Sequence, residues 1–139
     1  MYENYTRQSL PPKEYREILG TAICVFNSNN VFVIENILRI DSANYDWSEL
    51  IDRTSGSLLK PIEQVITNQS NNEIALLFKK LVENRNRIIH SFQITLHDEQ
   101  ILSTKNKKGE QYPITLDYLL EFIRDNESLS SLLYKLRGK

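Results

Sequence analysis

The sequence has little of what several common protein classes require. Cys24 is the single cysteine, which excludes an intramolecular disulfide framework and a cysteine-based zinc knuckle. The four glycines are isolated, so the chain has no glycine-rich phosphate loop. The chain has two histidines, and His97-Asp98 has no third or fourth ligand at usable spacing. We therefore predict no metal site and no cofactor.

Long apolar runs are also missing. None approaches the roughly 20 residues that a membrane span needs, so we expect no membrane segment. The first residues, Met1 to Asn4, lack the basic-then-apolar pattern of a secretory signal. These features lead us to expect a cytoplasmic protein.

The composition is that of a globular chain. Of its 139 residues, 40% are hydrophobic and 25% are charged, which argues against disorder. This length predicts one domain over residues 1–139. The net charge of −1 excludes a generally basic coat for nucleic acid.

The charge is unevenly distributed. Residues 1–78 carry six Lys+Arg and ten Asp+Glu, whereas residues 79–139 carry eleven and eight. The balance therefore changes from −4 to +3 along the chain. This asymmetry indicates a polyanionic partner near the second half, although ordinary surface variation is the simpler explanation.

The first half predicts helices. Pro11-Pro12 end an N-terminal extension over residues 1–11, and an apolar stripe at helical spacing then runs from Tyr15 to Ile40. Asn29 and Asn30 lie on this stripe and require polar partners. A break at residues 27–30 is the alternative, but we favour one continuous helix. Shorter helices follow at 47–51 and 58–67.

The second half mixes helix and strand. The strongest helix is predicted over about 73–91, and alternation then predicts a β-hairpin insertion over about 93–113. Two further helices are expected, from Thr115 to about Arg124 and from Ser128 to Leu136. The predicted fold class is mainly α, a helical bundle with a small β-hairpin.

The chemically informative segment is residues 83–90, Glu-Asn-Arg-Asn-Arg-Ile-Ile-His. On a helix, Arg85 lies on the apolar stripe, where a guanidinium is costly unless it is paired or faces a cleft or interface. An adjacent polar face carries Lys79, Glu83, Asn86 and His90. Arginine stabilises phosphate charge, histidine moves protons near neutral pH, and an asparagine amide orients a ring or a ribose hydroxyl. Together they could cut RNA without a metal.

The motif Arg-Asn-x-x-x-His, here Arg85-Asn86-Arg87-Ile88-Ile89-His90, resembles the signature of the HEPN superfamily (higher eukaryotes and prokaryotes nucleotide-binding). The resemblance implies an antiparallel HEPN-like α-bundle that acts as a metal-independent endoribonuclease in toxin–antitoxin, abortive-infection or CRISPR systems. It implies a homodimer with one composite site, an RNA substrate, and an antitoxin or regulatory protein as a further partner.

The resemblance also assigns roles to residues. Arg85 and His90 become the catalytic pair, and Asn86 positions the substrate. Many members add a polar residue from the first long helix, and we assign that role to Asn29 and Asn30 by inference. The candidates for contact with the RNA backbone are Lys79, Arg87, Lys105, Lys107 and Lys108.

Two features depart from the family pattern. Phe92 stands where many toxins paired with nucleotidyltransferase antitoxins carry tyrosine, so control by modification of a tyrosine there is not expected. The hairpin after His90 is not part of the minimal bundle, and it is interpreted as an elaboration that contacts substrate or partner.

Two other interpretations stay open. Arg85 could pair with a buried carboxylate while His90 favours the helix dipole, which would make both residues structural. A non-catalytic HEPN-like dimer that binds a nucleotide or a protein is the second. For Lys105, Lys107 and Lys108, a solvated turn is the simpler explanation.

Overall fold

A computed structural model describes residues 3–138 of the chain. Its first helix, α1 (Lys13–Ile40), is continuous through Asn27–Asn30, as favoured from the sequence. Asparagine is a poor helix former, but Asn29 is buried and its amide donates to Asn126 on the last helix, at 2.8 Å to the carbonyl and 3.0 Å to Oδ1. This tertiary pairing offsets the low helix propensity of the segment.

The chain then crosses the bundle through short helical pieces. These are α2 (Trp47–Asp52), a 3₁₀ turn (Ser55–Leu58), α3 (Leu59–Pro61), a π-helical turn (Ile62–Ile66) and α4 (Thr67–Gln69). The helix expected over 58–67 is therefore present as a longer run of changing pitch. Leu58, Ile62 and Ile66 are fully buried, so the run contributes directly to the core.

The helix that carries the motif is α5 (Glu73–Ile89), which ends two residues before the predicted boundary. His90 caps it with φ −94° and ψ 27°, and its backbone N–H donates to the carbonyls of Asn86 and Ile88. The strand β1 (Phe92–Leu96) begins two residues later. The motif therefore lies where the helix ends and the sheet begins.

The predicted hairpin is a three-stranded antiparallel sheet in the order β1-β2-β3, with β2 (Glu99–Lys105) between β1 and β3 (Gln111–Pro113). Leu96 pairs with Glu99 across a two-residue turn in which His97 and Asp98 have φ of 51° and 65°. Positive φ at both central residues is the geometry of the tight turns that match strand twist. The short strand β3 was not predicted separately.

The last helix, α6 (Leu116–Arg137), corrects the sequence prediction of two helices. The predicted break lies at residues 125–127, which are polar and include two poor helix formers, Asp125 and Asn126. In the structure Asn126 is buried at 1% exposure, donates to the carbonyl of Phe122, and accepts from Asn29. The contact with α1 stabilises the continuous helix, and it cannot be predicted from local helix propensity.

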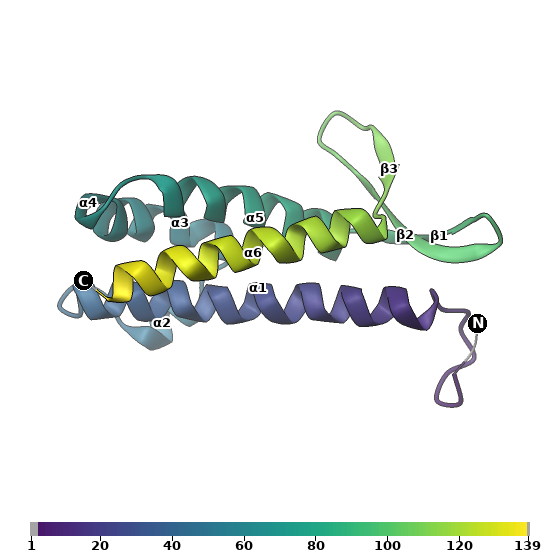
Figure 1. Cartoon of the computed structure of the whole chain (residues 1–139), viewed down its shortest axis with the longest axis horizontal. Helices are drawn as coiled ribbons and strands as arrows, with labels where there is room; N and C mark the ends of the chain where they lie inside the picture. The colour runs from purple at the N-terminus through teal and green to yellow at the C-terminus, as the bar shows by residue number, and fades with distance from the viewer. Residues whose placement is uncertain (1–2, 139) are drawn as a thin grey trace.

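The three long helices α1, α5 and α6 run along the long axis of the molecule, and the sheet projects from one end (Figure 1). The helix α5 is antiparallel to both others, so α1 and α6 are parallel. Hydrogen bonds between them at one constant sequence offset confirm this, from Asn29 to Asn126 and from Arg39 to Leu136. The bundle is therefore not antiparallel throughout.

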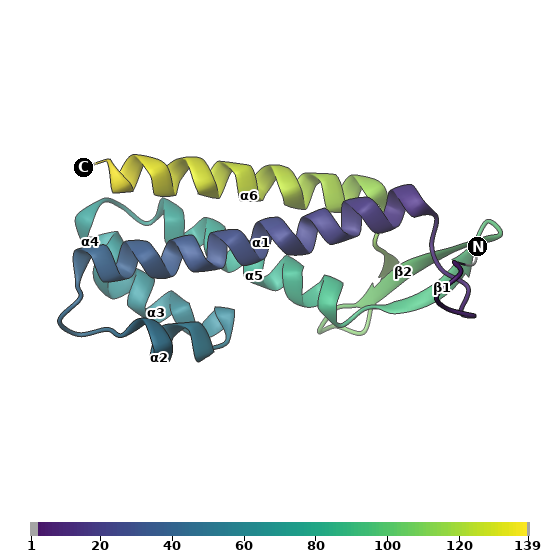
Figure 2. The ribbon, with the colours of Figure 1, turned by 90° about the horizontal axis from the view of Figure 1, so that it is seen from below.

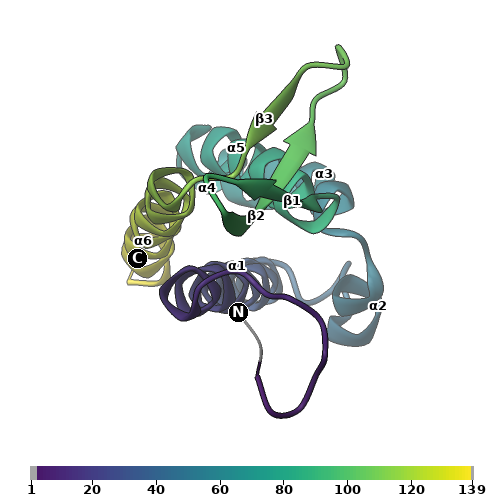
Figure 3. The same ribbon diagram turned by 90° about the vertical axis from the view of Figure 1, so that its right-hand side faces the viewer.

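The core lies between these helices and the crossing segment. The segment with α2 and α3 covers the side of α1 that is remote from α6 (Figure 2, Figure 3). Phe26 stacks between Phe78 and Phe122, at centroid distances of 6.2 and 6.1 Å. Tyr15 joins α1 to the sheet end, because its hydroxyl donates to the Ile114 carbonyl at 2.6 Å and accepts from the Leu102 amide.

Among the described residues, α1 is a helix long and apolar enough to cross a bilayer by length and composition alone. Core helices of globular proteins meet the same criterion. Here α1 packs against α6 and buries Phe26, Val33, Ile34 and Ile37. The sequence has no long uninterrupted apolar run in this helix, because the polar residues 27–30 separate its apolar residues. The helix was therefore not predicted as a candidate membrane span.

Candidate functional site

Arg85 occupies the apolar side of α5, as the helical projection predicts. Its guanidinium carbon lies 5.1 Å from the centroid of the Phe26 ring on α1. Its Nε is buried and has no hydrogen-bond partner within residues 3–138. Burial lowers the pKa of the guanidinium from its ordinary value, but arginine stays charged at neutral pH.

No carboxylate neutralises this charge. The ion pairs among the described residues join Arg16 to Glu3, Arg53 to Glu49 and Lys80 to Asp125, and Arg85 is in none of them. The interpretation of Arg85 as the partner of a buried carboxylate is therefore wrong for this part of the chain. A half-buried cation stacked on an aromatic ring is left without an anion.

His90 lies five residues later at the end of α5 and is exposed. Its backbone is fixed by the bond from its N–H to the Asn86 carbonyl, at 2.9 Å. No hydrogen bond joins the Asn86 side chain to the His90 ring in the described structure, so the predicted orientation of the ring by that amide is not seen. The ring is accessible to a substrate.

Arg85 and His90 are on different sides of α5. Five residues on an α-helix correspond to a rotation of about 140° and a rise of about 7.5 Å. Arg85 covers Phe26, whereas His90 follows the polar side that carries Asn86. Within one protomer, the two side chains therefore do not converge on one small group.

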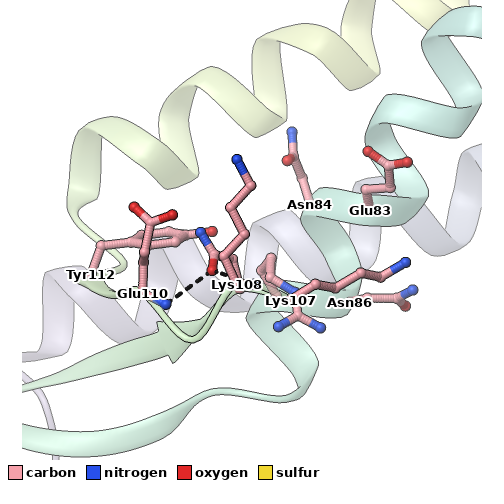
Figure 4. Close-up of a pocket in the computed structure, with 9 residues that line it drawn as sticks. Glu83, Asn84, Asn86, Lys107, Lys108, Glu110 and Tyr112 are labelled. Atoms are coloured by element: carbon pink, nitrogen blue, oxygen red, sulfur yellow. Dashed lines mark hydrogen bonds between the residues drawn. The ribbon is translucent and has the colours of Figure 1, made fainter.

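A cleft of about 460 Å³ opens beside this end of α5 (Figure 4). One wall is α5 and the other is the turn between β2 and β3. The lining residues are Glu83, Asn84, Asn86, Arg87, Asn106, Lys107, Lys108, Glu110 and Tyr112. Four sequence-predicted residues meet here, namely Asn86, Arg87, Lys107 and Lys108, whereas Arg85, His90, Lys79 and Lys105 are not among the lining residues.

The turn that forms the basic wall is tightly hydrogen-bonded. The Asn106 Oδ1 accepts from the backbone N–H groups of Lys108 and Glu110, at 2.9 and 3.0 Å. Gly109 has φ of 85°, a conformation that glycine adopts without steric cost. The Arg87 guanidinium donates to the Lys105 carbonyl and so holds the turn against α5.

Tyr112, which lines the cleft, lies beside Tyr118 on α6. The rings of Tyr112 and Tyr118 lie 6.4 Å apart, and the Tyr118 hydroxyl approaches the Asn84 carbonyl at 3.5 Å. Burial, with a smaller contribution from Tyr112, raises the pKa of Tyr118 to about 12. Sequence reasoning missed Tyr112 as a cleft residue because a short strand gives too little alternation to assign its face.

The two asparagines assigned to substrate positioning on α1 have other partners. The Asn29 amide is committed to Asn126, and Asn29 is 5% exposed. Asn30 accepts from the Ser55 hydroxyl at 2.8 Å. Asn30 lies one turn along α1 from Phe26, on which Arg85 stacks, whereas neither asparagine lines the cleft.

The remaining candidates are exposed. Lys79 lies on α5 and Lys105 at the end of β2. Within residues 3–138, no three His, Cys, Asp or Glu side chains gather as metal ligands. Cys24 is exposed.

No protein-family model matches the chain, and neither the curated proteins nor the solved structures gave a significant match.

Proposed function

We propose that the chain is a HEPN-type, metal-independent endoribonuclease that acts as a homodimer in the cytoplasm, in a defence or toxin role. The observation that carries the proposal is the Arg85 guanidinium. It is half-buried without an anion at the helix end where His90 is exposed. The mainly α fold and the position of the motif at the end of a long helix support the proposal, although α1 and α6 run parallel.

The cost of partly burying the unpaired Arg85 guanidinium favours an anionic ligand at this position. Desolvating a guanidinium is costly, and the Phe26 ring offsets part of the cost through its negative face. A phosphate would offset more, because the planar guanidinium matches two of its oxygens. Keeping such a residue unpaired is unfavourable for folding and useful for binding an anion.

In the proposed reaction, the His90 imidazole removes the proton from a ribose 2′-hydroxyl. The 2′-oxygen attacks the adjacent phosphorus, and the bond from phosphorus to the 5′-oxygen breaks. The departing 5′-oxygen takes up a proton from water, and the protonated imidazole releases its proton to solvent. Arg85 stabilises the added negative charge on the pentacoordinate phosphorus. The products are a 2′,3′-cyclic phosphate and a 5′-hydroxyl.

The separation of Arg85 from His90 supports a site shared by two chains. Ile89 is 51% exposed on the Arg85 side of α5, and Phe92 is 42% exposed just after the helix. Exposed apolar side chains around an unpaired cation fit an interface better than open solvent. A second copy placed there would supply its own His90 and Arg85 across the interface. An antitoxin or regulatory protein would control this activity.

The test is cleavage of a mixed RNA pool in excess EDTA by the wild type and by His90→Ala. Both proteins are first matched for melting temperature and dimer mass. Cleavage by the wild type alone, with 2′,3′-cyclic phosphate ends, is the expected result. Absence of cleavage by either protein, with both folded and dimeric, would contradict the proposal.

A non-catalytic dimer that binds a nucleotide or protein is the second candidate. It is favoured by the position of the cleft, which lies on the polar side of α5 and is lined by neither Arg85 nor His90. Under that function, Arg85→Ala would change binding or stability, and the wild type would not cut RNA.

A further inference from the structure

We propose that the cleft between α5 and the β2–β3 turn binds one nucleotide of single-stranded RNA, with guanine as the preferred base. The inference rests on the proposed function and deepens it, because Asn86 lines the cleft one helical turn before His90. A nucleotide held there lies on the side of α5 that carries His90.

The cations of the cleft are placed for the phosphate of that nucleotide. Lys107 and Lys108 are exposed, enter from the turn, and have no ion pair with a carboxylate in the described structure (Figure 4). Arg87 approaches from α5. Contacts of this kind to an RNA backbone are independent of sequence and weaken as salt is added.

Tyr112 supplies a surface for the base. It is half-buried, lines the cleft, and has its ring centroid 6.4 Å from that of Tyr118. Single-stranded RNA is commonly bound by stacking of its bases on tyrosine and phenylalanine rings. A volume of about 460 Å³ falls in the range of sites that hold small molecules.

Two carboxylates favour guanine over the other bases. Glu83 and Glu110 both line the cleft, and neither side chain has a hydrogen bond or ion pair within residues 3–138. A carboxylate only accepts hydrogen bonds. Guanine is the RNA base with two adjacent donors on its Watson–Crick edge, so one carboxylate can accept both in a bidentate contact.

The site is already formed without a ligand. The Asn106 side chain fixes the backbone of Lys108 and Glu110, and Arg87 fixes the turn to α5. Binding therefore does not have to order the basic wall, which reduces its entropic cost.

The test uses the full chain and short fluorescent RNA strands that carry 2′-fluoro groups. These strands have no attacking 2′-hydroxyl, so binding is measured whether or not the chain is a nuclease. One strand is oligouridine with a central guanine, and the other is uridine throughout. We expect the guanine strand to bind about ten-fold tighter in fluorescence anisotropy.

Variants separate the contributions. Tyr112→Ala is expected to weaken binding about ten-fold, whereas Tyr112→Phe keeps the ring and the affinity. Lys107→Ala/Lys108→Ala is expected to weaken binding and flatten its salt dependence. The matched control Lys60→Ala/Lys135→Ala removes the same charge from exposed positions outside the cleft and keeps wild-type affinity. Glu83→Gln/Glu110→Gln is expected to remove the preference for guanine, because no carboxylate is left in the cleft to accept both donors.

Equal affinity for the two strands would overturn the guanine assignment. If folded Tyr112→Ala and the Lys107/Lys108 double variant both bind RNA with wild-type affinity, the cleft is not the RNA-binding site. Displacement of the strand by guanosine monophosphate at equal concentration would show that the cleft binds a free nucleotide rather than RNA. If the binding pattern holds but no RNA is cut in EDTA, only the nuclease proposal fails.

Discussion

The guanidinium carbon of Arg85 lies 5.1 Å from the centroid of the Phe26 ring. That ring is itself fixed between Phe78 and Phe122 in the core, so the charge rests on a rigid support. Because no carboxylate pairs with Arg85 in the described residues, its charge remains available to an incoming anion. A fixed, partly desolvated and unneutralised cation is suited to stabilise charge that develops during a reaction.

Arg85→Met should separate function from stability. Methionine keeps the contact with the Phe26 ring and removes the cost of the unpaired charge, so the melting temperature should stay equal or rise. RNA cleavage in EDTA should fall by about 100-fold or more, because the phosphate loses its cation. Thermal denaturation and a gel assay measure the two effects.

Arg124→Met is the matched control, because Arg124 is an exposed arginine on α6. It should leave both melting temperature and cleavage unchanged. A large loss of stability in Arg85→Met would instead show that Arg85 is a structural residue.

The pKa of Tyr118 predicts a loss of stability at high pH. The folded-state pKa of about 12 lies above the ordinary 10.0, so the folded protein holds this proton more tightly than the unfolded chain does. This contribution is complete below about pH 10 and is lost as the pH rises toward about 12. Burial raises the pKa of Tyr15 too, so it acts in the same direction.

Urea unfolding at pH 9 and at pH 11 checks this. Tyr118→Phe should make the loss of stability between these values smaller. A pH dependence that is equally steep in Tyr118→Phe would contradict the assignment.

The Asn29–Asn126 pair should matter for folding. Asn29→Ala leaves the buried Asn126 oxygens without their donor, and we expect a loss of about 2 kcal/mol in the free energy of unfolding. Asn27→Ala, an exposed asparagine on the same helix, should change it by less than about 0.5 kcal/mol. Chemical denaturation of both variants measures the difference, and equal stabilities would contradict a structural role for the pair.

Arg87 should hold the β2–β3 turn in place. Arg87→Ala removes the donor to the Lys105 carbonyl, so the amides of residues 105–111 should exchange faster with solvent. The rest of the sheet should exchange as in the wild type. Hydrogen exchange read by mass spectrometry checks this, and unchanged protection of the turn would show that the Asn106 bonds are sufficient.

The sequence predicted the long helices well where an apolar stripe continued without interruption, as in α5. It failed at residues 125–127, where α6 continues because Asn126 has a buried partner on α1. The contact was not predicted at Asn29 either, because its partner lies 97 residues away in the sequence. Local propensity depends on neighbouring residues in the sequence, whereas the helical conformation at Asn29 and Asn126 is stabilised by their contact with each other.

The candidate site was partly accessible from the sequence. Spacing on a helix placed Arg85 on the apolar side, and the structure puts it over Phe26. The cleft required the sheet to fold back on α5, because Tyr112 and Lys107 approach Asn86 only through the turn. That arrangement depends on the bond from Arg87 to the Lys105 carbonyl, which has no sequence signature.

The most direct test of a site shared by two chains is a mixing experiment. Arg85→Ala and His90→Ala should each be inactive alone, but a mixed dimer holds one intact pair, with Arg85 from one chain and His90 from its partner. After refolding in equal amounts, half of the dimers are mixed, and each mixed dimer holds one intact pair where the wild-type dimer holds two. The mixture should therefore cut RNA in EDTA at about a quarter of the wild-type rate. An active wild type with an inactive mixture would contradict the shared site.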